Sequence, residues 1–162
     1  GSSDWNSWDR RWIWRGTYAP TLGGEQLRAV VGIDTSGSVS PTLLQSFLIE
    51  VGGILDSVEK LEVDLYWSDT KLYGPVHLTA SSDIDDLTPR GGGGTDLAPL
   101  FVRAQELADA DGLSELPVVY LTDGFGPTLS QTPPSVSALW VIPENGKLDQ
   151  PFGEIVPIEV QK

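Results

Sequence analysis

Residues 27–33 (LRAVVGI) form a short apolar run that ends directly at a cluster of acidic and hydroxyl-bearing residues, 34–38 (DTSGS). A nearly continuous apolar run of this length is typical of a strand buried on both faces, as in the centre of a parallel sheet. Ser40 and Pro41 then supply a helix N-cap and a first helical residue, and apolar residues recur at three- and four-residue spacing as far as Val58. A buried strand followed by an amphipathic helix predicts a right-handed βαβ crossover.

The rest of the chain repeats this alternation of strand and helix patterns. A second helix is predicted from Leu97 to Ala108, and the proline-rich residues 127–134 are predicted to be a loop. Further strands are predicted at residues 61–67, 72–78 (an antiparallel edge strand, because it contains Gly74-Pro75), 117–121, 139–142 and 155–160. We therefore predict an arm, 1–26, followed by one doubly wound α/β domain, 27–162. Its six-stranded sheet is mostly parallel and Rossmann-like, with helices on both faces.

Composition narrows the classes of partner. The chain carries 10 basic and 23 acidic residues, a net charge of −13. Such a surface repels phosphate backbones and anionic lipids, so we expect neither nucleic acid nor a membrane as a partner. The absence of cysteine excludes disulfides, zinc–thiolate sites and thiol catalysis, and it agrees with the cytoplasmic location that we expect. Because the sequence opens abruptly at a Trp-rich segment, we also expect it to be one domain of a larger protein.

Three polar clusters fall where predicted strands end or where the second helix begins. They are residues 34–38 (DTSGS), 91–96 (GGGGTD) and 122–124 (TDG). In open α/β sheets ligands bind beyond the carboxyl ends of the strands, so side chains from these clusters are expected to face one point. Their carboxylates and hydroxyls are the oxygen ligands preferred by Mg²⁺, or by Mn²⁺ or Ca²⁺. The predicted metal ligands are Asp34, Ser36, Ser38, Thr95 and Asp123.

Each cluster also has a purely structural interpretation. Ser36 and Ser38, with Ser40, are residues suited to capping the following helix, and Asp123-Gly124 is a common turn pair. Asp96 is better explained as a helix cap than as a direct ligand. Coincidence of all three clusters in register is harder to explain without a shared ligand.

The order D-x-S-x-S (34–38), G-G-T-D (93–96) and T-D-G (122–124) resembles the metal-ion-dependent adhesion site of von Willebrand factor A-like (VWA-like) domains. With 139–141 (LWV) and the lead-in residues 10–20, the chain is most similar to bacterial VWA-like domains that follow a metallopeptidase-like domain. The resemblance implies that the same five residues bind the metal and that Asp96 either caps the helix or orients a metal-bound water. It also implies a protein-interaction role, beside an AAA+ ATPase or an upstream metallopeptidase-like domain.

Several enzyme classes find no support in the residues. The glycine run lacks the Lys-Ser/Thr of a P-loop, no G-x-G-x-x-G follows the first strand, and His77 is the only histidine. We therefore predict a metal-dependent interaction module without catalysis, whose cation captures an acidic side chain of a protein partner. Two alternatives stay open: a metal-assisted phosphohydrolase, for which only Arg90 and Lys71 are basic residues near the clusters, and a scaffold whose cation merely pins loops.

The arm alternates tryptophan with arginine. Packing of these rings on the domain is the favoured interpretation, because large aromatic side chains dominate burial energetics. Docking to a neighbouring domain is the alternative, and single-stranded nucleic acid is a distant third given the net charge. The residues concerned are Trp5, Trp8, Arg10, Arg11, Trp12, Trp14 and Arg15.

Overall fold

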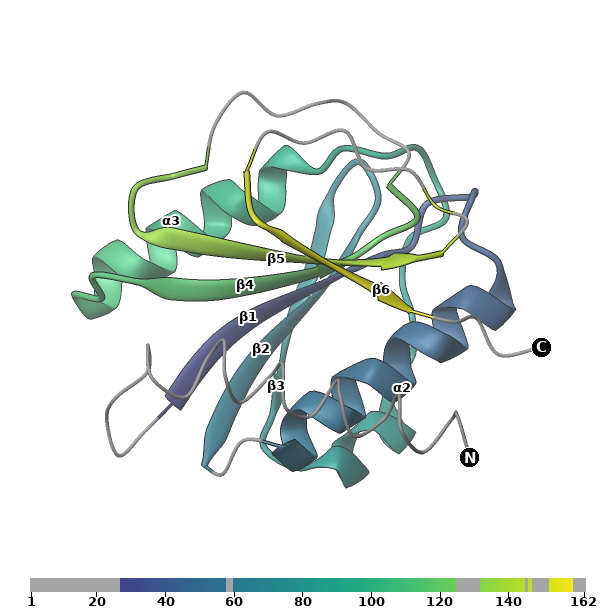
Figure 1. The fold of residues 1–162 in the computed structure, drawn as a ribbon, viewed down its shortest axis with the longest axis horizontal. Coiled ribbons are helices and arrows are strands. Elements are labelled where there is room, and N and C mark those ends of the chain that lie inside the picture. Colours follow the sequence, from purple (N-terminus) through teal and green to yellow (C-terminus); the bar gives the residue numbers. More distant parts are fainter. Residues whose placement is uncertain (1–26, 58–59, 125–131, 145, 147–151, 159–162) are drawn as a thin grey trace.

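The computed structural model describes residues 27–57, 60–124, 132–144, 146 and 152–158 (Figure 1). The elements are β1 (Leu27–Asp34), α2 (Pro41–Ser57), β2 (Leu61–Ser68), β3 (Leu72–Leu78), the 3₁₀ helix η1 (Ser81–Asp86), α3 (Ala98–Asp111), β4 (Leu116–Leu121), β5 (Val136–Pro143) and β6 (Glu154–Ile158). The predicted arm and most of the proline-rich loop lie outside these residues.

The six strands form one sheet in the order β3-β2-β1-β4-β5-β6. Strand β1 pairs in parallel with both β2 and β4, and the parallel pairing continues through β5 to β6. Of the strands that the structure describes, only β3 is antiparallel, at the edge beside β2. The predicted doubly wound α/β fold is therefore confirmed. The parallel pairing also brings the carboxyl ends of β1, β2 and β4 to one edge of the sheet.

Successive residues of each central strand face opposite layers of the core. In β1, Val31 and Ile33 pack in the layer that holds Phe47 of α2, whereas Val30 packs in the layer that holds Leu100 of α3. Figure 1 shows the same arrangement, with α2 and η1 on one face of the sheet and α3 on the other. All five of these side chains are fully buried, so both helices are anchored by apolar packing.

A glycine in β1 lets α3 approach the sheet closely. Gly32 lies in register between Tyr66 of β2 and Tyr120 of β4. A Cβ at this position would stand 2.3 Å from Leu100 Cδ2, so the first turn of α3 occupies the space that a larger residue would fill. Because Gly32 precedes Asp34 by two residues, this contact holds the start of α3 beside the carboxyl end of β1.

Three elements differ from the sequence-based prediction. Helix α3 continues to Asp111, three residues beyond the predicted end at Ala108. Strand β5 begins at Val136, three residues before the predicted start, because Ser137 and Ala138 pair in register with β4 although they interrupt the apolar run. The 3₁₀ helix η1 was not predicted, since its sequence SSDIDD has no helical apolar period. A carboxylate organises it instead: Asp83 Oδ2 accepts the backbone amides of Thr79 and Ala80.

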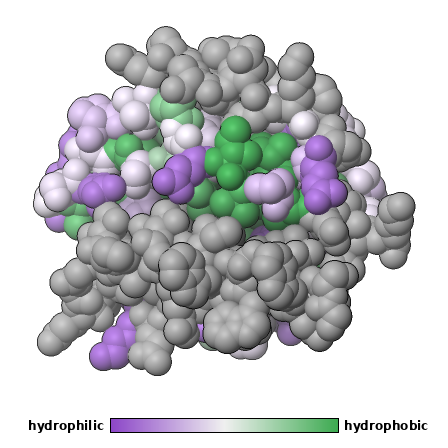
Figure 2. Space-filling model, viewed as in Figure 1, coloured by the Kyte–Doolittle hydropathy of each residue, from purple (hydrophilic) through white to green (hydrophobic). Residues whose placement is uncertain are grey.

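The face seen in Figure 2 carries a patch of hydrophobic side chains in its middle, where β5 and β6 lie in Figure 1. Strand β6 forms this edge of the sheet, and its Ile155 is 55% exposed. Among the described residues, no helix is long and apolar enough to cross a membrane.

Candidate metal-binding site

Asp34 is the last residue of β1 and is completely buried. Its Oδ1 accepts the backbone amide of Ser36 at 2.9 Å, and its Oδ2 accepts the Thr122 hydroxyl at 2.6 Å. Thr122 directly follows β4, so this bond joins the ends of two adjacent parallel strands. Both oxygens of the carboxylate are therefore fixed by neutral donors.

Three further oxygens form a short chain beside Asp34. Ser36 Oγ lies 3.2 Å from Ser38 Oγ, and Ser38 Oγ donates to Asp123 Oδ2 at 2.7 Å. Adjacent ligands of an octahedral Mg²⁺, each about 2.1 Å from the ion, lie about 3 Å apart. The two spacings match that separation, and the donors are all hard oxygens, so the residues present fit a divalent cation. Ser36 and Asp123 are buried whereas Ser38 is exposed, so the site reaches solvent at Ser38.

The glycine loop, residues 91–94, lies beside the first cluster, residues 34–38, and hydrogen bonds that involve backbone groups hold the two together. The Gly37 amide donates to the Gly93 carbonyl at 2.9 Å, and the Thr35 hydroxyl donates to the Arg90 carbonyl at 2.6 Å. A Cβ on Gly91, whose φ is +122°, would stand 2.3 Å from Thr35 Oγ1. The loop therefore needs glycine at this position to approach the cluster.

The fifth predicted ligand, Thr95, lies two residues beyond the Gly93 carbonyl and is half-buried. The backbone hydrogen bond between Gly37 and Gly93 joins its loop to residues 34–38. Asp96, in contrast, has a local role: its Oδ1 accepts the Ala98 amide in the first turn of α3 at 3.0 Å. Asp96 precedes the N-cap residue, Leu97, and its carboxylate satisfies an amide of the first turn as a capping side chain does.

The electrostatics of Asp34 are unusual for an aspartate. Burial raises its pKa, the hydrogen bonds from Ser36 and Thr122 offset part of that effect, and the nearby charge of Asp123 raises the pKa further. None of the largest causes of this shift is a lysine or an arginine of the described residues. A divalent cation would relieve both the burial penalty and the repulsion between the two carboxylates.

Sequence reasoning missed Asp69, which follows β2 at the same edge of the sheet and is 5% exposed. Its carboxylate accepts the amides of Lys71 and Gly93, and the hydroxyl of Tyr73 lies 3.4 Å from Oδ2. The signal was present: a carboxylate directly after a predicted parallel strand is the criterion that identified Asp34 and Asp123. Thr122 was overlooked because its neighbour Asp123 is the predicted functional residue of that cluster.

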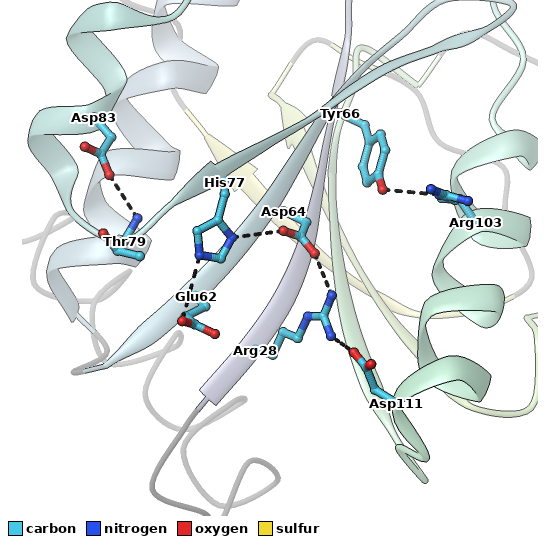
Figure 3. A network of polar contacts seen from close by, with 9 residues as sticks. All are labelled: Arg28, Glu62, Asp64, Tyr66, His77, Thr79, Asp83, Arg103 and Asp111. Atoms are coloured by element: carbon cyan, nitrogen blue, oxygen red, sulfur yellow. Dashed lines mark hydrogen bonds and ion pairs between the residues drawn. The ribbon is translucent and has the colours of Figure 1, made fainter.

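A second polar network lies at the opposite end of the same strands (Figure 3). Asp64 of β2 accepts a hydrogen bond from Arg28 Nη2 at 2.8 Å and lies 3.1 Å from Nδ1 of His77. Arg28 also pairs with Asp111 at the end of α3, and His77 lies 3.8 Å from a Glu62 carboxylate oxygen. These residues satisfy one another, so the network is a structural one.

Within the described part of the chain, no group of three or more histidine, aspartate or glutamate side chains is arranged to hold a metal ion. The candidate site is of another composition: two carboxylates, from Asp34 and Asp123, and the hydroxyls of Ser36 and Ser38. Such a set is suited to a hard cation that keeps part of its hydration shell, as Mg²⁺ does.

Comparison with known proteins agrees with the fold. A family model described as "VWA-like domain (DUF2201)" matches residues 29–159. The fold is similar to that of the ArnB paralog VWA2 from Sulfolobus acidocaldarius (TM-score 0.57, 15% identity, covering 72% of this chain and 34% of that one). It is also similar to an aerotolerance-related membrane protein from Bacteroides fragilis (TM-score 0.55, 12% identity, covering 72% of this chain and 67% of that one). No curated protein sequence matches at a significant level.

Proposed function

The chain belongs to the VWA-like domain family, whose members are generally protein-interaction modules, and we propose that it binds a protein partner through a divalent cation. The cation, Mg²⁺ or alternatively Mn²⁺ or Ca²⁺, would be held by Asp34, Ser36, Ser38 and Asp123, with Thr95 completing the protein's ligands directly or through water. The chain spans about a third of the archaeal protein that it resembles, so the activity and partners of the whole protein are proposals as well.

The observation that carries this proposal is the line of oxygens from Ser36 through Ser38 to Asp123, at 3.2 and 2.7 Å, beside the buried Asp34 carboxylate. A pair of carboxylates in one pocket is unfavourable unless a proton or a cation offsets their charge. The neutral donors around Asp34 orient it without supplying that charge. Both the geometry and the charge of the pocket thus favour a cation.

A bound divalent cation would supply a positive centre with a free coordination position, which suits a carboxylate from a partner. This chain's own residues determine access to it. Ser38 and the four glycines of residues 91–94 are exposed, so a side chain of a partner can approach the candidate ligands from their side. Asp34, Ser36 and Asp123 are buried behind them.

We propose no catalysis for this chain. A phosphohydrolase at the same carboxylates needs a base and cations that hold the transferring phosphoryl group. The only histidine, His77, lies in the network at the far end of β2. Of the basic residues near the pocket, Arg90 lies over the Tyr73 ring at 5.0 Å. The phosphohydrolase remains the competing hypothesis, because it would use the same metal ligands.

The partner is proposed by its chemistry, an exposed aspartate or glutamate. An AAA+ ATPase or an upstream metallopeptidase-like domain is a source of such a side chain, and both stay predictions. The bacterial origin and the cytoplasmic location stay predictions too.

Calorimetric titration with Mg²⁺ tests the site. We expect the native chain to bind one ion and Ser38→Ala to lose at least about tenfold in affinity, because the hydroxyl that links Ser36 to Asp123 is removed. Ser82→Ala, an exposed serine of η1, is the matched control and should bind as the native chain does. Equal affinity of native and Ser38→Ala would contradict the site.

The interaction is tested with a short glutamate peptide and its glutamine counterpart. A chain of net charge −13 repels the glutamate peptide, so binding that appears with Mg²⁺ and disappears with EDTA requires the cation. Circular dichroism with EDTA separates this proposal from the scaffold alternative, in which chelation unfolds the domain. Release of phosphate from p-nitrophenyl phosphate, lost in Asp34→Ala, would instead support the phosphohydrolase.

A further inference from the structure

Asp69 makes two kinds of contact. One is local: Oδ1 accepts the amide of Lys71, two residues on, at 2.9 Å, as aspartates commonly do in turns. The other crosses the molecule: Oδ2 accepts the amide of Gly93, in the glycine loop, at 3.1 Å. A turn residue needs only the first contact. The second ties the β2–β3 turn to a loop that is 24 residues away in sequence.

The backbone of Asp69 makes a second connection to the same loop. Its carbonyl accepts the amide of Asp96 at 2.9 Å, so both ends of the loop segment that contains Thr95 are attached to one residue. The carboxylate also stands 3.2 Å from the position of a Cβ on Gly93, an approach that leaves little room for a side chain there. The amides of Lys71 and Gly93 lower the pKa of Asp69 although partial burial opposes this, so the carboxylate is ionised at neutral pH.

Gly93 is in turn hydrogen-bonded to the first cluster, residues 34–38. The amide of Gly93 donates to Asp69, while its carbonyl accepts the amide of Gly37, between Ser36 and Ser38. A single peptide segment therefore connects Asp69 to the loop that carries two of the proposed ligands. The neighbouring residue Ser68 adds a parallel connection, since its carbonyl accepts the amide of Thr35 at 2.8 Å.

We propose that Asp69 is the positioning residue of the metal-binding site: it holds the glycine loop against the first cluster and thereby sets the place of Thr95, Ser36 and Ser38. This inference rests on the proposed function. Asp69 touches none of the five proposed ligands with its carboxylate, and it acts through the Gly93 peptide. A site made of three separate loops needs such a support, because side chains on loops hold a metal geometry only when the loops themselves are fixed.

The test compares Asp69→Asn with Asp83→Asn. Both aspartates accept two backbone amides in a turn, but Asp83 does so at the start of η1 and has no contact with the glycine loop. Asparagine keeps one carbonyl acceptor, so the Lys71 and Gly93 amides of Asp69→Asn must compete for it. Amide hydrogen exchange in the metal-free chain and calorimetric Mg²⁺ titration are measured on each protein.

In Asp69→Asn we expect faster exchange at the Gly93 and Gly37 amides and an Mg²⁺ affinity that is lower by about 10- to 100-fold, as for other residues that support metal ligands. Asp69→Ala should weaken both further, and Asp83→Asn should change neither. Unchanged exchange at Gly93 in Asp69→Asn would overturn the inference, and so would faster exchange with native affinity. If the native chain binds no Mg²⁺, the proposed function fails. The exchange data then still decide whether Asp69 holds the loops.

Discussion

Two buried aspartates on neighbouring parallel strands have opposite surroundings. Asp64 of β2 pairs in register with Val30, four residues before Asp34 on β1, so Asp64 lies in the amino-terminal half of the strand pair and Asp34 at its carboxyl end. The carboxylate of Asp64 pairs with the side chains of Arg28 and His77. Asp34 accepts hydrogen bonds from neutral groups of Ser36 and Thr122, and it stands near a second carboxylate, Asp123.

The pKa shifts follow these surroundings. Burial alone would raise the pKa of Asp64, but the hydrogen bonds and charges of Arg28 and His77 outweigh it and the pKa is lowered. At Asp34, burial dominates and the pKa is raised. The protein therefore balances the charge of Asp64 with its own side chains, whereas burial and neutral hydrogen-bond donors are the largest influences on the pKa of Asp34. We propose that a bound cation balances the charge of Asp34.

The largest expected effect is the loss of metal binding on removing the charge at Asp34. Asp34→Asn keeps the size of the side chain and an acceptor for the Ser36 amide, so the fold should persist. We expect Mg²⁺ affinity to fall more than about 100-fold, because a buried carboxylate is removed from the ligand set. Calorimetry measures this, and native affinity in Asp34→Asn would remove the site from consideration.

The corresponding substitution at the other aspartate, Asp64→Asn, should lower stability and leave metal binding unchanged. Asp64→Asn leaves Arg28 and His77 without their shared carboxylate, and we expect a loss of about 2 kcal/mol in the free energy of unfolding. Urea unfolding measures it. Asp111→Asn is the control: it removes the other carboxylate of Arg28, which is 44% exposed, and should cost less than about 1 kcal/mol. Weaker Mg²⁺ binding in Asp64→Asn would mean that the two ends are coupled.

A pair of glycine substitutions separates backbone strain from the contact between the loops. Gly91 and Gly92 have nearly the same φ, +122° and +119°, so alanine strains the backbone similarly at each. Only at Gly91 would the new Cβ meet Thr35, whereas nothing lies within 4 Å of a Cβ on Gly92. We expect Gly91→Ala to cost about 1–2 kcal/mol more than Gly92→Ala in urea unfolding, and to weaken Mg²⁺ binding more. Equal losses would show that the loop tolerates displacement.

The smallest effect is expected in the acid dependence of stability. The pKa of Asp64 in the folded chain lies below its ordinary value of 3.8. Its contribution is therefore fully present above that value and is lost as the pH falls through the lower, folded-state pKa. Urea unfolding between about pH 5 and about pH 2 should show a shallower acid loss in Asp64→Asn than in the native chain. Parallel acid profiles would indicate that Arg28 and His77 do not stabilise the charge.

The sheet, and the proximity of most of the candidate ligand residues, could be predicted from the sequence because both depend on local patterns. Apolar runs that end at polar clusters located β1 and β4, and the carboxyl-edge rule then brought Asp34 and Asp123 together. Contacts made by backbone groups were beyond such reasoning. The link from Asp69 through Gly93 to Gly37 depends on loop conformation, which no periodicity encodes. The balance of charge at Asp64 likewise depends on register between strands, which places His77 beside it.

Thermal unfolding of the native chain and Asp34→Asn, each with and without Mg²⁺, tests the central claim most directly. Without metal, Asp34→Asn should be at least as stable as the native chain, because the buried charge and its repulsion from Asp123 are removed. Mg²⁺ at about 100 times its Kd should raise the Tm of the native chain by about 5–10 °C and leave Asp34→Asn unchanged. An equal rise in both proteins, or none in the native chain, would contradict the claim that Asp34 binds a divalent cation.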